Sequence, residues 1–172
     1  MNYFELFEMP VSLKVDAAAL AKKYFELQKK YHPDYYSTAS NEVQAEVLEK
    51  VAHINRAFKT FKNPDETIKY VLIQKGLLEE EEKYQLPPDF LMEMMELNEA
   101  LAEAAFGDAG SLDEIKMSME NAEKEIYLPV QSIIENYKDG DTSEAALLKV
   151  KEYYYKKKYL NRLKEQLKQN EI

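Results

Sequence analysis

The sequence predicts an all-α protein with two helical units, an N-terminal antiparallel helix pair with short flanking helices and a C-terminal antiparallel three-helix bundle. Three observations support this fold class. Apolar residues recur every three or four positions over long stretches, the spacing of one helix face. The 172 residues include 4 glycines, a residue that helix interiors tolerate poorly. No stretch alternates apolar and polar residues as a half-buried strand would.

Composition limits the classes of partner and cofactor. The formal net charge is -9, and an acidic chain binds a phosphate backbone poorly, so we expect no nucleic-acid partner. With Cys 0 and His 2, no credible metal-ligand set exists, and we expect no cofactor. No signal peptide is visible, and no apolar run reaches the ~18 residues of a membrane span. We therefore expect a cytoplasmic protein with no membrane partner.

The first long helix is expected to follow Asp16, a good N-cap residue. Leu20, Leu27 and Tyr31 then share one face at helical spacing. Four lysines fall off that face, against a single glutamate, Glu26. These are Lys22, Lys23, Lys29 and Lys30. We expect a helix with one buried side and one basic side.

Pro33 ends this helix within Tyr31-His32-Pro33-Asp34. The proline ring disfavours the helical conformation of His32 and removes a backbone donor. We therefore expect His32 and Asp34 on a loop. A second apolar helix follows, and Asn63-Pro64-Asp65 is expected to end it and to start another. The pattern predicts an antiparallel helix pair with the loop at its tip.

Residues 77–88 are expected to form an acidic linker between an N-terminal unit, residues 1–76, and a C-terminal unit, residues 89–172. Residues 77–106 contain nine acidic residues and one basic residue. Four of these acidic residues are consecutive glutamates, and the Pro87-Pro88 pair follows them. Such a composition is typical of a solvated connection.

The apolar pattern of the C-terminal unit predicts three long helices joined by short turns. Helices connected in this way pack as an antiparallel bundle. Pro129 lies inside the pattern of the middle helix, so we expect a kink there. Ser111 and Asp141 are expected to cap the middle and last helices. Lys157 is the one polar residue in the apolar stripe of the last helix.

The first bundle helix is predicted to have two different faces. At about 100° per residue, Phe90, Met94, Leu97 and Leu101 cluster on one side, which can face the bundle. The opposite side carries two methionines beside a row of carboxylates: Met92, Met95, Glu96, Glu99 and Glu103. Methionine adapts to varied partner surfaces, so this side is a candidate binding face. The alternative is that the methionines only fill gaps between helices.

The N-terminal features together resemble a J-domain: a short first element, a basic helix, His32-Pro33-Asp34 and an apolar antiparallel helix. Three stretches resemble more specifically the HscB-type co-chaperones of iron–sulfur cluster assembly. They are Tyr3-Phe4-Glu5-Leu6-Phe7, Leu27-Gln28-Lys29-Lys30-Tyr31-His32-Pro33-Asp34 and Phe90-Leu91-Met92-Glu93. The resemblance covers essentially the whole chain. One departure is that Thr67 and Ile68 stand where Arg-Ala is common in that family.

The resemblance implies an adaptor that performs no chemistry itself. Such a protein binds an IscU-type iron–sulfur scaffold, delivers it to a DnaK/HscA-class chaperone and stimulates the chaperone ATPase. By this resemblance, the residues expected to stimulate the chaperone ATPase are His32, Pro33 and Asp34. The residues expected to dock on an acidic chaperone surface are Lys22, Lys23, Lys29 and Lys30. The positions that match the scaffold interface are Leu91, Met92, Met95, Glu96, Glu99, Glu103 and Tyr159.

Two other function classes are alternatives to this adaptor role. A general J-domain co-chaperone that holds unfolded clients would favour a broad exposed apolar groove. A helical hydrolase could use His32 and Asp34, but neither has a visible nucleophile, and nothing in the sequence places two carboxylates in one pocket. We expect a monomer, although the sequence leaves dimerisation and the identity of the cognate partners open.

Overall fold

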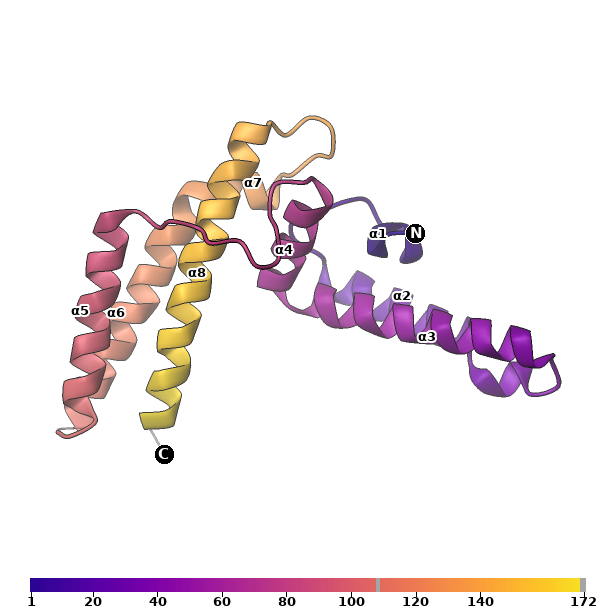
Figure 1. Ribbon diagram of the computed structural model, residues 1–172, viewed down its shortest axis with the longest axis horizontal. Helices are drawn as coiled ribbons and strands as arrows, with labels where there is room; N and C mark the ends of the chain where they lie inside the picture. Colours follow the sequence, from indigo (N-terminus) through magenta and orange to yellow (C-terminus); the bar gives the residue numbers. More distant parts are fainter. Residues whose placement is uncertain (108, 171–172) are drawn as a thin grey trace.

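The structure is a computed structural model that describes residues 1–107 and 109–170. Within these residues it contains helices and connecting segments only, which confirms the all-α prediction. The molecule has two arms (Figure 1). One, the bundle arm, consists of α5 (Pro88–Ala104), α6 (Ala109–Tyr127) and α8 (Glu144–Asn170), which lie side by side. The other, the hairpin arm, is the pair α2 (Ala17–Lys30) and α3 (Asn41–Lys62), which projects sideways. The elements are α1 (Tyr3–Leu6), α2 (Ala17–Lys30), η1 (Pro33–Tyr36), α3 (Asn41–Lys62), α4 (Pro64–Gln74), α5 (Pro88–Ala104), α6 (Ala109–Tyr127), η2 (Leu128–Val130), α7 (Gln131–Glu135) and α8 (Glu144–Asn170).

Local hydrogen bonds fix the ends of the N-terminal helices as the sequence predicts. The Asp16 carboxylate accepts a hydrogen bond from the Ala19 amide at 2.8 Å and starts α2. The Asn63 side chain accepts one from the Asp65 amide at 3.0 Å, so Asn63 ends α3 and starts α4. Gly76 has φ +72°, the left-handed conformation that closes a helix, and α4 ends there. These caps set the lengths of the helices in the hairpin arm.

Thr67, which departs from the family pattern, is accommodated in α4. Its side chain is 1% exposed. The hydroxyl donates a hydrogen bond towards two carbonyl oxygens, those of Asn63 at 3.0 Å and Thr60 at 3.2 Å. A buried hydroxyl with a partner avoids the penalty of an unsatisfied polar group. Thr67 therefore packs at the junction of α3 and α4 without leaving its buried hydroxyl unsatisfied.

A single apolar cluster joins the two arms. Buried residues of the N-terminal region lie in the same cluster as buried residues of α7, α8 and the turn before them. From the N-terminal region it includes Leu13, Leu20, Ile54, Phe61, Ile68 and Leu72; from the C-terminal region it includes Val130, Ile134, Leu147, Val150, Tyr153, Tyr154 and Tyr155. The base of the hairpin arm is therefore packed against the N-terminal half of α8.

The expected linker is fixed to α8 rather than free. Leu78 is 4% exposed. The ring of Tyr84 stacks on that of Tyr155 with centroids 4.5 Å apart, and Glu82 forms an ion pair with Lys151 at 2.7 Å. The acidic segment thus crosses α8 between α4 and α5, as the ribbon shows (Figure 1).

The distal part of the bundle has its own core. Its buried side chains come from α5, α6 and α8: Phe90, Met94, Leu97, Leu101, Ala104, Ile115, Met119, Ala122, Leu160, Leu163 and Leu167. The four residues of α5 that were predicted to face inward are all in this core. The outward placement of Met92 and Met95 follows, because they occupy the opposite side of the same helix.

Pro129 breaks the middle helix as predicted. The segment continues through the 3₁₀ turn η2 into α7, because proline has no amide hydrogen to donate to the preceding turn. The two predicted caps of the bundle are wrong. Helix α6 begins at Ala109, so Ser111 lies inside it. Ser143, not Asp141, starts α8, since its hydroxyl accepts a hydrogen bond from the Ala146 amide at 3.1 Å.

Lys157 lies where the two arms meet. Its Nζ is 3.3 Å from Asp65 Oδ2 of α4 and 3.4 Å from Glu123 Oε1 of α6. Asn161 also donates a hydrogen bond to the Asp65 carboxylate, at 3.0 Å. Burial alone would lower the pKa of Lys157, but the nearby carboxylates, Asp65 first, outweigh it and the pKa is raised. The one polar residue of the α8 stripe is therefore a charged link between α4, α6 and α8.

Candidate functional site

The His-Pro-Asp sequence forms a short turn at the end of the hairpin arm far from the bundle (Figure 1). His32 caps η1, and Pro33 is the first residue of this 3₁₀ turn. The predicted irregular loop is thus one regular turn. His32 Nδ1 accepts a hydrogen bond from the Asp34 amide at 3.3 Å. The two side chains are 53% and 88% exposed, so both are available to a partner.

Side-chain hydrogen bonds hold this turn on both sides. The Tyr36 hydroxyl donates to the Lys30 carbonyl at 3.1 Å, at the end of α2. The Gln44 amide donates to the carbonyls of Ser37 and Ala39, both at 3.1 Å, at the start of α3. Fixing a loop before a partner binds reduces the entropy that binding must overcome. His32 and Asp34 are therefore presented by a pre-ordered turn.

The four predicted docking lysines have different surroundings. Lys22, Lys29 and Lys30 are exposed on α2. Lys23 is half-buried and forms ion pairs with Glu8 at 3.0 Å and Glu26 at 3.7 Å. The hydrogen bond to Glu8 is the main cause that raises the pKa of Lys23. Lys23 is therefore engaged within the molecule, whereas the other three can meet a partner.

The outer side of α5 is exposed as its periodicity predicts. Met92 is 62% exposed and Met95 is 57% exposed. The carboxylates of this side, on Glu96, Glu99 and Glu103, are exposed as well. Apolar side chains beside carboxylates at i, i+3 and i+4 form one continuous ridge. The ridge can contact a partner without disturbing the buried side of α5.

Leu91 of α5 and Tyr159 of α8 line the same cavity. It has a volume of about 470 Å³ and lies between residues 82–86, α5 and α8, with Tyr84 and Arg162 also in its lining. Tyr159 is half-buried, and its ring lies edge-on to Phe90 with centroids 6.3 Å apart. Part of the Tyr159 side chain therefore packs the bundle and the rest faces the cavity.

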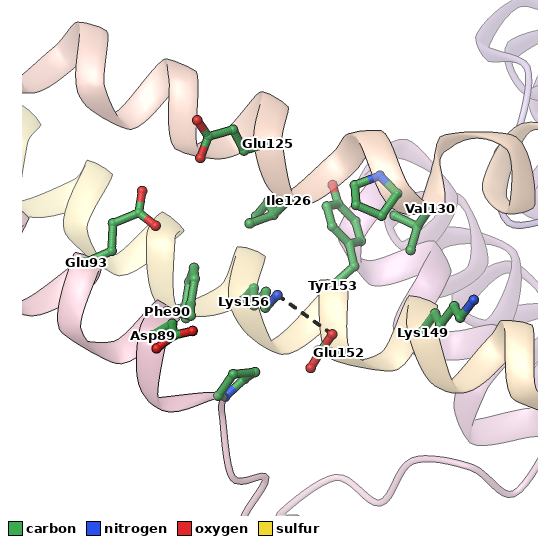
Figure 2. Close-up of a pocket in the computed structure, with 12 residues that line it drawn as sticks. Asp89, Phe90, Glu93, Glu125, Ile126, Val130, Lys149, Glu152, Tyr153 and Lys156 are labelled. Carbon is green, nitrogen blue, oxygen red and sulfur yellow. Dashed lines mark ion pairs between the residues drawn. The ribbon is translucent and has the colours of Figure 1, made fainter.

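A larger cavity, of about 590 Å³, opens beside the Pro129 bend (Figure 2). Several carboxylates line this pocket, which no pattern in the sequence indicated, and Figure 2 shows Glu93 and Glu125 among them. Burial, with the charges of Glu125 and Glu96, raises the pKa of Glu93. Lys156 lies 3.7 Å from Glu152. Glu93 and Glu125 nevertheless remain exposed to solvent, so the desolvation of Glu93 is only partial.

The structure groups the predicted site residues into two sets on different arms. The His-Pro-Asp turn and the exposed lysines share the hairpin arm. The α5 ridge, with Leu91 and Tyr159, lies on the bundle arm (Figure 1). Sequence reasoning did not single out two exposed aromatic residues near the first set, Phe25 at 72% and Tyr35 at 71% exposed. The position of Phe25 off the apolar stripe of α2 was the signal that could have identified it.

Within residues 1–107 and 109–170, no group of three or more His, Asp or Glu side chains could hold a metal ion. None of the helices in this part of the chain combines the length and the apolar character needed to cross a membrane.

Comparison with known proteins gives one consistent family. Residues 86–168 match the family model of the HSCB C-terminal oligomerisation domain. The Co-chaperone protein HscB homolog of Photobacterium profundum is 32% identical over 172 residues, covering 99% of this chain and 97% of the relative. That of Shewanella halifaxensis is 34% identical over 170 residues, covering 97% and 95%.

Solved structures agree with the sequence relatives. The chaperone HscB from Vibrio cholerae superposes with a TM-score of 0.78 at 27% identity, covering 99% of this chain and 98% of that one. The human co-chaperone protein HscB superposes with a TM-score of 0.83 at 29% identity, covering 100% and 83%. The likeness extends over both arms, and the chain belongs to the HscB family of co-chaperones.

Proposed function

We propose that this co-chaperone binds an IscU-type iron–sulfur scaffold, delivers it to a DnaK/HscA-class chaperone and stimulates the chaperone ATPase during cluster assembly or transfer. The observation that carries the proposal is the separation of two exposed sites on two arms joined by one apolar core. A partner on the His-Pro-Asp turn leaves the α5 ridge uncovered. Both partners can therefore be held at once, at a spacing that the shared core fixes.

The hairpin arm is suited to an acidic chaperone surface. The exposed lysines of α2 attract such a surface and set its orientation more than they add affinity. The exposed Asp34 carboxylate can accept a charge-assisted hydrogen bond from an arginine of the chaperone. His32, Pro33 and Asp34 are the proposed stimulating residues. Among the four lysines, we place most of the docking on Lys22, Lys29 and Lys30, because Lys23 is paired within the chain.

The bundle arm is suited to a scaffold surface that presents both apolar and basic side chains. Met92 and Met95 offer apolar area, and the carboxylates of the ridge can pair with basic side chains around it. Small interfaces of this kind depend on a few central apolar residues. The proposed scaffold contacts are Leu91, Met92, Met95, Glu96, Glu99, Glu103 and Tyr159.

The alternative, a general J-domain co-chaperone for unfolded clients, is less well supported. A client-holding surface needs a broad apolar groove, whereas the α5 ridge is narrow and strongly acidic. We propose no catalytic activity for the chain itself, since the relatives are named co-chaperones. We also propose a cytoplasmic monomer, organised along the sequence as residues 1–76, an acidic linker 77–88 and a scaffold-binding unit 89–172.

Paired variants test the proposal. His32→Gln should leave scaffold binding and melting temperature unchanged but abolish ATPase stimulation, because the side chain is exposed. Met92→Ala with Met95→Ala should weaken scaffold binding but leave basal stimulation near wild type. The measurements are a pull-down with purified scaffold and single-turnover ATP hydrolysis by a purified DnaK-class chaperone. Undiminished stimulation by His32→Gln, or no scaffold capture by the wild type, would refute the proposal.

A further inference from the structure

Helix α2 has an exposed apolar strip in the middle of its basic side. Phe25 is 72% exposed, although phenylalanine is among the residues most often buried. At about 100° per residue, Ala18 and Ala21 lie within about 40° of Phe25 around the helix axis, about two turns and one turn before it. Lys22 and Lys29 precede and follow it by about one turn on the same side. The neighbouring alanines leave the ring uncovered. The strip is therefore a flat apolar surface with ammonium groups at its border.

The internal packing of α2 does not use this ring. Leu20 and Leu27 are buried on the opposite side. Tyr24 stacks on Phe58 of α3 with centroids 3.8 Å apart and supplies the aromatic contact between the two helices. Removing the Phe25 ring would therefore leave the hairpin contacts in place. An exposed ring that does not stabilise the fold has its apolar area available for a partner.

The strip lies within reach of the His-Pro-Asp turn. A helix rises about 1.5 Å per residue, so Phe25 is roughly 10 Å along α2 from His32. Tyr35, 71% exposed, has its ring 6.0 Å from that of His32. A standard interface covers about 800 Å² on each partner, enough to span both features. One docked protein can cover Phe25, the exposed lysines and His32 together.

We infer that Phe25 is an apolar anchor for the chaperone and gives the docking contact a component that salt does not screen. This inference rests on the proposed function. The occupant it requires is a DnaK-class chaperone surface with an apolar depression bordered by carboxylates. The lysines at the border would pair with those carboxylates, and the ring would fill the depression. Exposed charges are screened over ~10 Å at 0.1 M salt, whereas burial of a ring is not.

The test compares three variants in binding to a purified DnaK-class chaperone at low and high salt. Phe25→Ala should weaken the affinity about tenfold at both salt concentrations and leave the salt dependence unchanged, as for an apolar residue central to an interface. Lys22→Ala with Lys29→Ala should instead reduce the salt dependence. Phe106→Ala is the matched control, since Phe106 is 96% exposed and follows directly after the end of α5. Phe25→Leu should retain part of the affinity.

The outcomes separate this inference from the proposed function. If the wild type neither binds nor stimulates the chaperone, the proposed function fails. If the wild type binds and His32→Gln loses stimulation, but Phe25→Ala binds like Phe106→Ala, only the anchor is refuted. Sedimentation of the wild type should show no self-association, and vesicles of anionic lipid should not bind it. Phe25-dependent dimers, or Phe25-dependent vesicle binding, would assign the strip to a different occupant and overturn the inference.

Discussion

Lys23 differs from the other lysines of α2 because it already has anionic partners. Its ammonium contacts Glu8, a residue with φ 51° in the turn that follows α1. A side chain with a carboxylate at 3.0 Å has less to gain from an acidic partner than one in water. Docking strength should therefore differ among neighbouring lysines of identical charge.

This difference gives a prediction for single substitutions. Lys22→Ala and Lys29→Ala should each weaken chaperone binding several-fold at low salt, and the losses should shrink as salt rises. Lys23→Ala should weaken binding less and should lower stability by under 1 kcal/mol, since the pair is largely at the surface. Binding assays across a salt series, with thermal melts, measure both effects. Equal losses for all three lysines would contradict the distinction.

Single residues also show where sequence reasoning succeeded and failed. Asp16 was predicted as a cap, and Asn63-Pro64-Asp65 as the point where one helix ends and the next begins; both predictions agree with the structure. Asp141 was predicted to cap the last helix, but Ser143 does so, because propensity alone does not choose between nearby residues with a suitable oxygen. The pairing of Lys23 with Glu8 depends on a turn of the backbone that no local pattern records.

At the scale of the helix, α5 separates packing from recognition. Its buried side holds the bundle, and its exposed side carries Met92 and Met95. Periodicity predicted this division correctly, because a helix that faces a core on one side must expose the other. The binding role of the exposed side stays a prediction, since exposure alone does not name a partner.

The stability of the double variant Met92→Ala, Met95→Ala follows from this division. We expect the free energy of unfolding to change by about 1 kcal/mol or less, as for surface substitutions generally. The matched control is Met94→Ala on the buried side, which should cost ~2–5 kcal/mol. Urea unfolding of the two variants provides the comparison. A double variant as unstable as Met94→Ala would show that the methionines support the core.

Three consecutive tyrosines make α8 sensitive to alkali. Burial raises the pKa of Tyr153 and of Tyr154 to about 12, from an ordinary value of 10.0. The unfolded chain therefore loses these protons at lower pH than the folded chain. The stability associated with them is complete below pH 10 and falls as the pH rises towards 12.

This linkage predicts how unfolding depends on pH. Between about pH 10 and pH 12, the free energy of unfolding should fall, with each tyrosine contributing on the order of 2 kcal/mol over its full shift. Tyr153→Phe and Tyr154→Phe should each make the decline less steep. Urea titrations at a series of pH values measure these slopes, and identical slopes for all variants would count against burial as the cause.

At the scale of the whole molecule, the two arms are stabilised by common contacts. The apolar cluster includes residues from Phe4 to Tyr155. Ion pairs surround it, including Lys14 with Glu135 at 3.7 Å and the contact of Lys75 with Asp139. Sequence reasoning predicted both units but not this shared core, because residues far apart in the chain carry no joint periodic signal.

Asp65→Asn tests whether the arms unfold together. The substitution leaves Lys157, with a side chain 13% exposed, without its α4 carboxylate, and we expect a loss of about 2 kcal/mol. Unfolding should remain one transition, with far-ultraviolet circular dichroism and tyrosine fluorescence coinciding. Glu80→Gln, in the exposed acidic run, is the neutral control. Separate melting of the hairpin arm and the bundle would refute the common core.

The shared core also sets the order in which the chain can mature on the ribosome. Domains generally fold N-terminal first, as synthesis proceeds at about 5–20 residues per second. Here the hairpin arm is made first, but Leu147, Val150 and Tyr153, which cover its base, are made near the end. For several seconds the nascent arm must carry uncovered apolar surface, so translation that stalls before α8 would release an aggregation-prone fragment. Completion of α8 is therefore the step of synthesis that allows the base of the hairpin arm to be covered.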